Sequence, residues 1–368
     1  MYSNGTGTCS CPTDNTTLIV ANDEGCAGGL AIGGGGRFTI PVTAGVCYLI
    51  RVIGFADSQG LGVLEVSAVS GSARVYVNAG GEGANNGSSW ANAYVNLQDA
   101  LRPAIAPTDI WVATGTYRPD RGSGITLGDR TATFQLNSGV AIYGGFAGGE
   151  TSALQRDPYT NVTILSGDLN NADLGGWEPG DPLWAENAYH VVTGSSVDSS
   201  AFLDGFVITH GHADGPAPNN SGAGMYNNGG SPQIFNSTFT GNRSAGSGGG
   251  VHNTGGGNAS FGNAVFTGNK AVNGGGMSNS ASSPSFIGGG GFLSNSASES
   301  GGGMFNLASH PDLWLCDFQQ NTAVDGAAMA NVGGSAPVLL QVRMNWNSAD
   351  ARGGVMFNQG DSRPELRS

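Results

Sequence analysis

One short polar segment of this chain carries the residue types that most often do chemistry. His210, His212 and Asp214 directly follow an apolar stretch that ends at Thr209. Imidazole and carboxylate groups so close together can bind a metal ion or exchange protons with a substrate. A segment this rich in glycine is also typical of a solvated turn, and the sequence favours the turn over a metal or acid/base site.

A second polar segment offers oxygen ligands for a cation. Asp168, Asn170 and Asp173 lie in a loop of Asn, Asp and Gly, and their oxygen atoms suit Ca²⁺. Their spacing misses the EF-hand register, and no glutamate follows at the place of the bidentate EF-hand ligand. Calcium is the one cofactor that the sequence suggests, and a polar loop without a metal is the alternative.

A pair of carboxylates is the third chemical candidate. Asp204 and Asp214 have the side chains of a glycosidase acid and base, although nothing in their spacing requires them to meet. In the second half of the chain, charged residues are sparse and occupy different positions of the repeat described next. They include the acidic residues Asp312, Asp317, Asp325 and Glu299, and the arginines Arg243, Arg343 and Arg352. We therefore expect no stacked catalytic pair there.

The elements that must position these residues follow from a repeat. A glycine-rich run, one apolar residue and then an asparagine two positions later recur six times. The asparagines are separated by 26, 26, 27, 25 and 27 residues, and they are Asn227, Asn253, Asn279, Asn306, Asn331 and Asn358. Self-similarity at a fixed period of this length is the signature of a stacked repeat architecture.

Two further phrases share the same period. An apolar residue, usually Phe, precedes a second asparagine by three positions, as in Phe239 with Asn242 and Phe266 with Asn269. A proline followed two residues later by an apolar residue comes before it, as in Pro284 and Phe286. Three apolar patches separated by three turns predict one coil of an all-β parallel β-helix, with about 26 residues per coil. The crossover rule predicts that the β-helix is right-handed.

Stacking places equivalent residues above one another at the strand spacing of about 4.8 Å. We expect an internal aromatic column from the Phe positions and a flexible apolar column from the Met positions. Asparagine tolerates left-handed backbone, and its amide can donate to the next asparagine, so the asparagines suit the turns.

Irregular coils should occupy residues 71–221 and regular repeats residues 222–368. Short apolar strands are expected at 110–112, 140–143, 162–165, 190–192 and 202–209. An amphipathic stripe from Trp90 to Leu101, preceded by Ser88 and Ser89, predicts a helix that caps the first coil.

Residues 1–70 differ in character. Short strands are expected at 38–40, 46–52 and 62–66. The clustered Cys9, Cys11, Cys26 and Cys47 suggest two disulfides and an oxidising compartment, with a zinc site as a poorly spaced rival. Cys316 stands alone and should be a small buried apolar residue.

Bulk properties exclude some partners. The net charge is -13 and only 11% of residues are charged, which argues against nucleic-acid binding. No apolar stretch is long enough for a membrane-spanning helix. The polar start without an apolar leader segment, and an end inside the next repeat, lead us to expect a piece of a longer secreted protein.

The repeated phrases resemble the polymorphic outer-membrane protein repeats of bacterial autotransporter-type passengers. The segments 75–78, 90–94, 110–117 and 143–146 resemble the opening of right-handed, pectin-lyase-like surface proteins, so the resemblance covers residues 71–368. The segment 38–66 resembles the closing strands of a pre-peptidase C-terminal-type β-sandwich, which implies a partial sandwich at residues 1–70.

Because the periodicity is strong and no catalytic group recurs at one position of the repeat, we expect a secreted or cell-surface structural, adhesin-like module without catalytic activity. The implied partners are an extracellular polysaccharide or the surface of a host or neighbouring cell. Two alternatives stay open: a polysaccharide lyase or glycoside hydrolase, and a calcium-dependent glycan-binding module. A functional site should lie where the repeated phrase is missing, in the coils before Gly222.

Overall fold

A computed structural model describes residues 2–3, 48–49, 73–173 and 182–367. The chain divides into two compact units, Met1–Ala31 with Gly36–Ser70 and Ile32–Gly35 with Gly71–Ser368. In the first unit, β1 (Tyr2–Ser3) pairs antiparallel with β2 (Tyr48–Leu49). Tyr48–Leu49 lies within the strand expected at 46–52, whereas the strands expected at 38–40 and 62–66 and the cysteines Cys9, Cys11, Cys26 and Cys47 lie outside the described residues.

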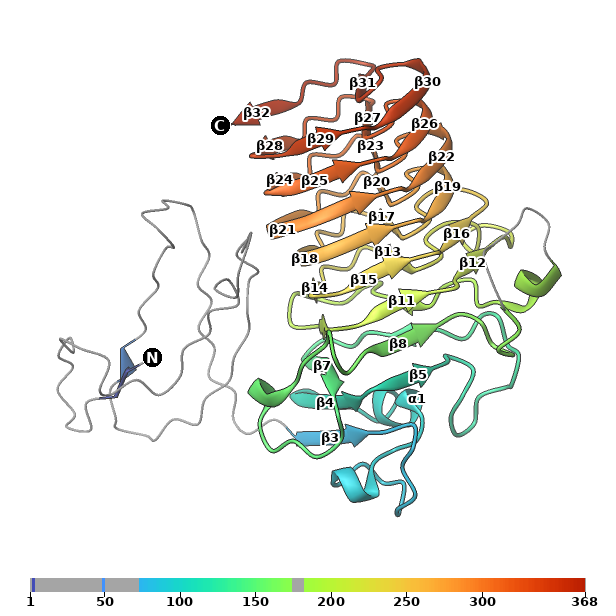
Figure 1. Ribbon diagram of the computed structural model, residues 1–368, viewed down its shortest axis with the longest axis vertical. Coiled ribbons are helices and arrows are strands. Elements are labelled where there is room, and N and C mark those ends of the chain that lie inside the picture. Colours follow the sequence, from blue (N-terminus) through green and yellow to red (C-terminus); the bar gives the residue numbers. More distant parts are fainter. Residues whose placement is uncertain (1, 4–47, 50–72, 174–181, 368) are drawn as a thin grey trace. The chain divides into compact units, whose positions relative to one another are not determined.

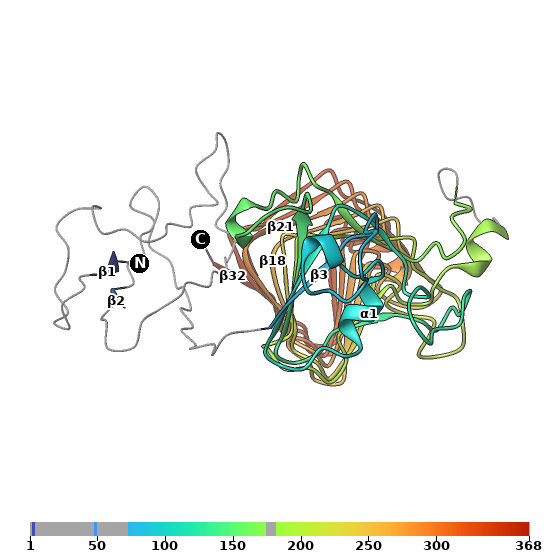
Figure 2. The same ribbon diagram turned by 90° about the horizontal axis from the view of Figure 1, so that it is seen from below.

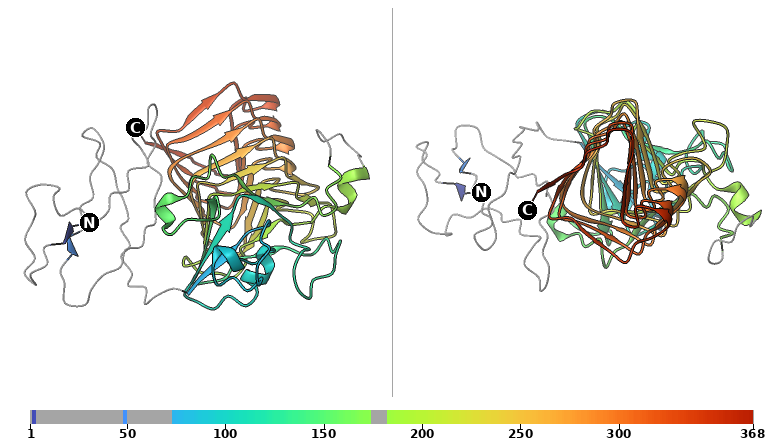
Figure 3. Two further views of the ribbon diagram at one scale, coloured as in Figure 1. Left: turned by 60° about the horizontal axis from the view of Figure 1, so that its bottom comes forward. Right: turned by 90° about the horizontal axis from the view of Figure 1, so that it is seen from above.

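The second unit is a parallel β-solenoid, which confirms the predicted fold class (Figure 1). Each strand pairs in parallel with its equivalent one coil further along the chain, as Met225 does with Val251 and Val251 with Met277. The coils overlie one another when viewed along the stack (Figures 2 and 3). The register follows the asparagine repeat, so the repeat period was read correctly from sequence. The right-handed sense stays a prediction from the crossover rule.

The first side of the coil is an eight-stranded sheet that begins each repeat. Its strands alternate between buried apolar or asparagine side chains and more exposed ones, as expected for a sheet with one face toward a core. They are β6 (Phe134–Gln135), β9 (Val192–Thr193), β13 (Met225–Asn228), β17 (Val251–Thr254), β20 (Met277–Ser280), β23 (Met304–Leu307), β27 (Met329–Val332) and β31 (Met356–Asn358).

The second side is a sixteen-stranded sheet to which most coils contribute two segments. These strands are β3 (Ala73–Val77), β4 (Thr108–Ala113), β5 (Gly115–Tyr117), β7 (Val140–Phe146), β8 (Thr163–Ser166), β10 (Phe202–Asp204), β11 (Val207–Thr209), β14 (Gln233–Phe235), β15 (Thr238–Thr240), β18 (Ser260–Thr267), β21 (Ser285–Leu293), β24 (Asp312–Trp314), β25 (Cys316–Gln319), β28 (Val338–Leu340), β29 (Arg343–Asn345) and β32 (Glu365–Arg367). The predicted single strand at 202–209 is two strands, because Gly205 bends the chain with a φ of 85°.

The third side is a six-stranded sheet that leads into the next glycine-rich run. It contains β12 (His212–Ala213), β16 (Arg243–Ser244), β19 (Lys270–Asn273), β22 (Ser296–Ser300), β26 (Thr322–Asp325) and β30 (Ser348–Arg352). Three sheets enclose the core, but they do not correspond one to one to the three repeated phrases. The Pro-x-apolar and Phe-x-x-Asn phrases both lie in the sixteen-stranded sheet, and the six-stranded sheet follows the second asparagine, where no repeated phrase was recognised.

The expected capping helix is not one continuous helix. The structure has a 3-10 turn, η1 (Trp90–Asn92), capped by the Ser89 side chain, and a separate helix, α1 (Leu97–Leu101). Between them the backbone of Tyr94 pairs with β3, which breaks the helical hydrogen bonding. The two remaining 3-10 turns are η2 (Ala153–Gln155) and η3 (Pro182–Glu186).

The core contains the two predicted columns. The rings of Phe239, Phe266, Phe292 and Phe318 stack with centroid separations of 5.0, 4.7 and 4.6 Å. Beside them a fully buried Met column runs through the eight-stranded sheet, with Val251 in one place. Cys316 is also fully buried, as predicted. Because like side chains stack on one another, the same packing arrangement fills the interior of each coil.

Both predicted asparagine ladders are present, but only the second is at a turn: the first lies within the strands of the eight-stranded sheet, and the second at the corner between the other two sheets. In one, Asn253 Nδ2 donates to Asn279 Oδ1 at 2.9 Å, and Asn279 Nδ2 donates to Asn306 Oδ1 at 2.8 Å. In the other, Asn269 donates its backbone N–H and its Nδ2 to Asn295 Oδ1 at 3.1 and 3.0 Å. These side chains are buried, so the ladders give hydrogen-bond partners to amide groups that would otherwise lack them.

Candidate functional site

Two long connections leave the irregular coils on one side and form a lateral lobe. We define the lobe as residues 118–133, between β5 and β6, and the described parts of 167–191, between β8 and β9. The yellow-green turn of η3 marks it beside the stacked coils in Figure 1. Of the ionisable residues singled out from sequence, Asp168 and Asp173 lie in this lobe, where the repeated phrase is missing, whereas Asp204, His210, His212 and Asp214 lie outside it.

Arginine side chains fix the lobe through backbone carbonyl groups. Arg118 Nε donates to the carbonyl oxygen of Asp168, and Arg121 Nη2 donates to that of Leu169, each at 2.6 Å. Arg130 Nε donates to the carbonyl oxygen of Asn187, also at 2.6 Å. These three guanidinium groups therefore tie the first connection to the second and hold the backbone of the acidic residues in place.

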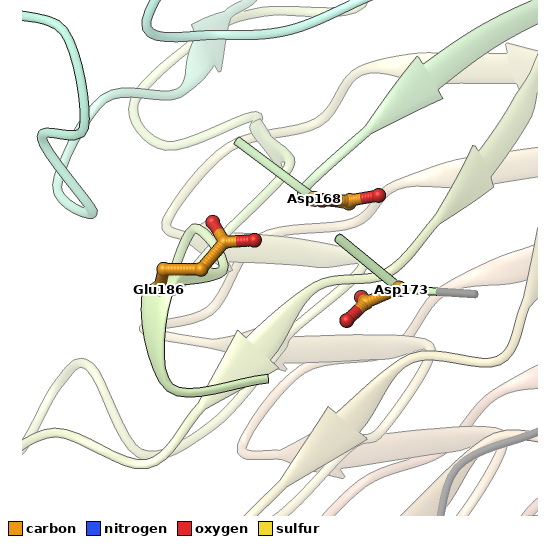
Figure 4. A group of neighbouring side chains, drawn as sticks. All are labelled: Asp168, Asp173 and Glu186. Carbon is orange, nitrogen blue, oxygen red and sulfur yellow. The ribbon is translucent and has the colours of Figure 1, made fainter. Parts of the chain in front are cut away.

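An acidic cluster lies at the centre of the lobe. One carboxylate oxygen from each of Asp168, Asp173 and Glu186 lies within 4.8 Å of the others (Figure 4). Asp168 is only 6% exposed. Two of the three predicted calcium ligands are therefore brought together. The third, Asn170, has an exposed side chain, and Glu186 of η3 takes its place. Sequence reasoning missed Glu186 because the turn that returns it to Asp168 has no local signal.

Backbone and amide donors hold the three carboxylates. Asp168 Oδ1 accepts from the backbone N–H of Ala172 at 3.0 Å, and Glu186 Oε2 accepts from that of Leu169 at 3.0 Å. Asp173 Oδ2 accepts from Asn187 Nδ2 at 2.8 Å. Among the described residues, the salt bridges of the lobe join other carboxylates, namely Asp120 and Asp214, to arginines.

The closeness of Asp168 changes the acidity of Glu186. Burial, a hydrogen bond to Asp168 and the charge of Asp168 together raise the pKa of Glu186 to about 7. Two carboxylates this close need either a shared proton or a cation between them. The donor set consists of hard oxygen atoms, which fits Ca²⁺ or Mg²⁺ and not a soft metal ion.

The predicted His/Asp group is held by structural contacts. His212 Nδ1 lies 2.8 Å from the carbonyl oxygen of Trp184 and 3.9 Å from Asp214 Oδ2. Asp214 forms an ion pair with Arg130. His210 occupies a left-handed corner with a φ of 58°. The rings of His210 and His212 lie 5.6 and 5.9 Å from that of Trp184.

Thus His210 and His212 are neighbours of Trp184, and they do not converge on a common point with Asp214. In the regular coils, the corner that His210 occupies is taken by Gly241 and Gly268, which also have positive φ.

Asp204 belongs to a different surface of the solenoid. It is 3% exposed and lies outside the main core among Tyr143, Phe202 and Phe235. Its Oδ1 lies 2.8 Å from Arg156 Nη2 and accepts from Asn236 Nδ2 at 3.2 Å. Burial raises the pKa of Asp204, and the charge of Arg156 opposes that rise.

Arg156 comes from the connection between β7 and β8, so the ion pair fastens that connection to the outside of the sheet. Asp204 and Asp214 bind different arginines from different connections, and the glycosidase-like pair considered from sequence is not assembled.

An aromatic stack near the first regular coil was not foreseen. The ring of Tyr226 lies 5.1 Å from that of His190 and 6.0 Å from that of His252. His190 contacts the carbonyl oxygen of Gly222 at 3.0 Å and Asn219 Oδ1 at 3.3 Å, whereas His252 Nδ1 is buried without a hydrogen-bond partner. Burial, with a smaller contribution from His190, lowers the pKa of His252 to about 4. The equal positions of Tyr226 and His252 in the repeat were the signal for this stack.

A short row of basic side chains was also not foreseen, although the equal positions of its residues in the repeat were again the signal. His212, Arg243 and Lys270 occupy one register position on β12, β16 and β19. Further along the same register position, the residues are the hydroxyl-bearing Ser296, Thr322 and Ser348.

Opposite charges also meet one coil apart at the far end of the solenoid. Arg343 forms a two-point ion pair with Asp317, and Arg352 forms one with Asp325. In the second half, these two shared positions hold opposite charges that form salt bridges, whereas Arg243 and Lys270 share a position with the same sign of charge.

In the part of the chain that the structure describes, no helix is long and apolar enough to span a bilayer. Comparison with family models, curated proteins and solved structures found no match to this chain.

Proposed function

We propose that this chain is a structural module of a secreted or cell-surface protein, an adhesin-like rod that presents its flanks without catalysing a reaction. The observation that carries the proposal is the unbroken stacking of like residues along the regular coils. Asn253, Asn279 and Asn306 form one hydrogen-bonded line, and the Phe rings form another line at separations near 5 Å. Such stacking produces a stiff, extendable scaffold, because stability is a sum over neighbouring repeats.

The use of the acidic residues supports the same proposal. Asp204 is enclosed by aromatic side chains and bound to Arg156. Asp214 is bound to Arg130, and Asp317 and Asp325 are bound to arginines of the next coil. A catalytic carboxylate needs access to the substrate and a proton at the right stage. These four side chains instead join neighbouring segments of the solenoid.

The repeat chemistry favours a more specific assignment. The glycine-rich run before each buried Met and the Phe-x-x-Asn ladder are the features that resemble polymorphic outer-membrane protein repeats. We propose that the solenoid is of the right-handed, pectin-lyase-like kind and carries repeats of that type at the cell surface, where it meets polysaccharide or another cell.

A degradation screen tests the proposal against its enzymatic rival. The purified chain would be incubated with pectins and other acidic polysaccharides, and new reducing ends and unsaturated products would be measured. The structural proposal predicts no turnover above the level of a heat-unfolded sample. Turnover that is lost in Asp204→Asn or Asp214→Asn, while the variants stay folded, would contradict it.

A further inference from the structure

We propose that Asp168, Asp173 and Glu186, with Asn187 beside them, form a binding site for one Ca²⁺ ion that fastens η3 to the segment that follows β8. The proposal concerns the lobe alone and does not depend on the function proposed above. It rests on three observations: the distribution of charges, the spacing of the carboxylate oxygens, and a buried amide oxygen that has no hydrogen-bond donor.

The first observation is the imbalance of charge. Asp168 and Glu186 are in direct contact, and the nearby guanidinium groups of Arg118 and Arg121 donate to the backbone carbonyls of Asp168 and Leu169. No described Lys or Arg lies within salt-bridge distance of Asp168 or Glu186. Buried charges are stable when they are paired or when they coordinate a metal. The arginines do not pair with these carboxylates, because they donate to backbone carbonyl groups, so a metal ion can balance the carboxylate charges.

The second observation is the spacing of the ligands. Carboxylate oxygens from all three residues lie within 4.8 Å of one another. Calcium binds oxygen at about 2.4 Å, so ligands on opposite sides of the ion are about 4.8 Å apart. Magnesium demands a near-octahedral set at about 2.0–2.1 Å and usually keeps several waters, whereas calcium accepts irregular sets of carboxylate and amide oxygens, so calcium suits this donor set better.

The third observation is independent of the carboxylates. Asn187 is fully buried, and its Nδ2 donates to Asp173 Oδ2 at 2.8 Å and to the carbonyl oxygen of His210 at 2.9 Å. Its Oδ1 has no hydrogen-bond donor, and neither has the buried Oε1 of Glu186. Buried polar atoms in folded proteins nearly always have a partner. Two donorless oxygens on consecutive residues, next to acidic side chains, are what a hard cation satisfies.

The site also has a mechanical consequence. Asp168 and Asp173 follow β8, whereas Glu186 belongs to η3 and Asn187 comes directly after it. One ion between them therefore fixes η3 against the end of a solenoid strand. It also steadies Trp184, whose ring lies between those of His210 and His212.

Calorimetry on the full chain tests the site. After removal of metals with a chelator, Ca²⁺ would be titrated into the wild type, Asp168→Asn, Glu186→Gln and the control Asp129→Asn. Asp129 lies in the same lobe, and its Oδ1 accepts only from Thr131. We expect one Ca²⁺ per wild-type and control chain, and at least a tenfold loss of affinity in the other two variants. Circular dichroism in chelator would show that all four chains are folded.

Terbium supplies a second readout at the same site. Tb³⁺ takes the place of Ca²⁺, and Trp184, two residues from Glu186, should sensitise its luminescence. We expect a signal that Ca²⁺ displaces and that Glu186→Gln abolishes. The proposal is overturned if the folded wild type binds no Ca²⁺, if Mg²⁺ binds and Ca²⁺ does not, or if Asp168→Asn and Glu186→Gln bind as the wild type does.

Discussion

The regular coils and the irregular coils of this solenoid satisfy their buried polar groups in different ways. In the regular coils each asparagine finds its partner one coil away, in the same residue type, as Asn279 does in Asn306. In the irregular coils each contact is particular: Arg118 reaches the carbonyl of Asp168, and Arg156 reaches Asp204. In the repeat, one residue type at one position satisfies the buried polar groups of every coil. Outside the repeat, each buried polar group needs its own partner, so the residues there differ from coil to coil.

The boundary between the two regions is defined by two glycines. Asn227 starts one ladder, and Gly194 occupies its position one coil earlier, so Asn227 Oδ1 is buried without a donor. Asn242 starts the other ladder, and Gly211 stands one coil earlier, where only its backbone N–H reaches Asn242 Oδ1. A glycine at a ladder position ends the ladder, because it has no amide to pass the hydrogen bond on.

The largest expected effect lies inside the regular coils. Phe266 is fully buried between the rings of Phe239 and Phe292. Replacing it with alanine leaves a cavity, so Phe266→Ala should lower the free energy of unfolding by about 3–5 kcal/mol. Urea unfolding followed by circular dichroism measures the change.

A matched substitution at the last coil sharpens this expectation. Phe357 is partly exposed and is covered on one face by the guanidinium of Arg352, 4.4 Å from the ring centroid. Phe357→Ala should cost only about 1 kcal/mol. Equal losses in the two variants would contradict the expectation that a buried position in the column stabilises the fold more than a partly exposed ring.

The next effect tests the junction between the regions through pH. The pKa of His252 is about 4 in the folded chain, against 6.5 for an unperturbed imidazole. Unfolded chains therefore bind a proton that the folded chain excludes between these values, and stability falls as pH drops from about 6.5 toward 4. The total is roughly 3 kcal/mol at about 1.4 kcal/mol per unit. Burial also lowers the pKa of His190, which acts in the same direction.

His252→Phe keeps an aromatic ring in the stack and removes the titrating group. It should flatten the pH dependence of the melting temperature between pH 4 and 6.5, by the amount that His252 contributes. Tyr226→Phe is the control, since it keeps both imidazoles, and its pH dependence should match that of the wild type. An unchanged slope in His252→Phe would mean that the buried imidazole is not the source.

Much of the regular region could be predicted from sequence because each signal is repeated. One occurrence of Phe239 with Asn242 says little, but its recurrence at Phe266 and Asn269 fixes both period and register. The same reasoning failed for single events. Nothing near Trp90 indicated that the backbone of Tyr94 would join β3 and divide the expected helix.

Only part of the candidate site could be predicted from sequence, because each of its residues occurs once and is not repeated. Asp168, Asn170 and Asp173 stood out because they offer oxygen ligands and are close in sequence. Glu186 joins them through a turn specified by tertiary contacts, including the hydrogen bond of Arg130 to Asn187. Asp204 was taken for a catalytic candidate because the sequence does not show that Arg156 lies beside it.

Native-state hydrogen exchange tests the central claim most directly, namely that the regular coils are one stacked scaffold. The backbone N–H groups of Asn269, Asn295 and Asn321 each donate to the side chain of the next asparagine at 3.0–3.1 Å. The account predicts that these three corner amides exchange only through global unfolding, and far more slowly than the amide of Leu127, which lies in an exposed turn of the lobe. Exchange of the corner amides at the rate of that turn would contradict it.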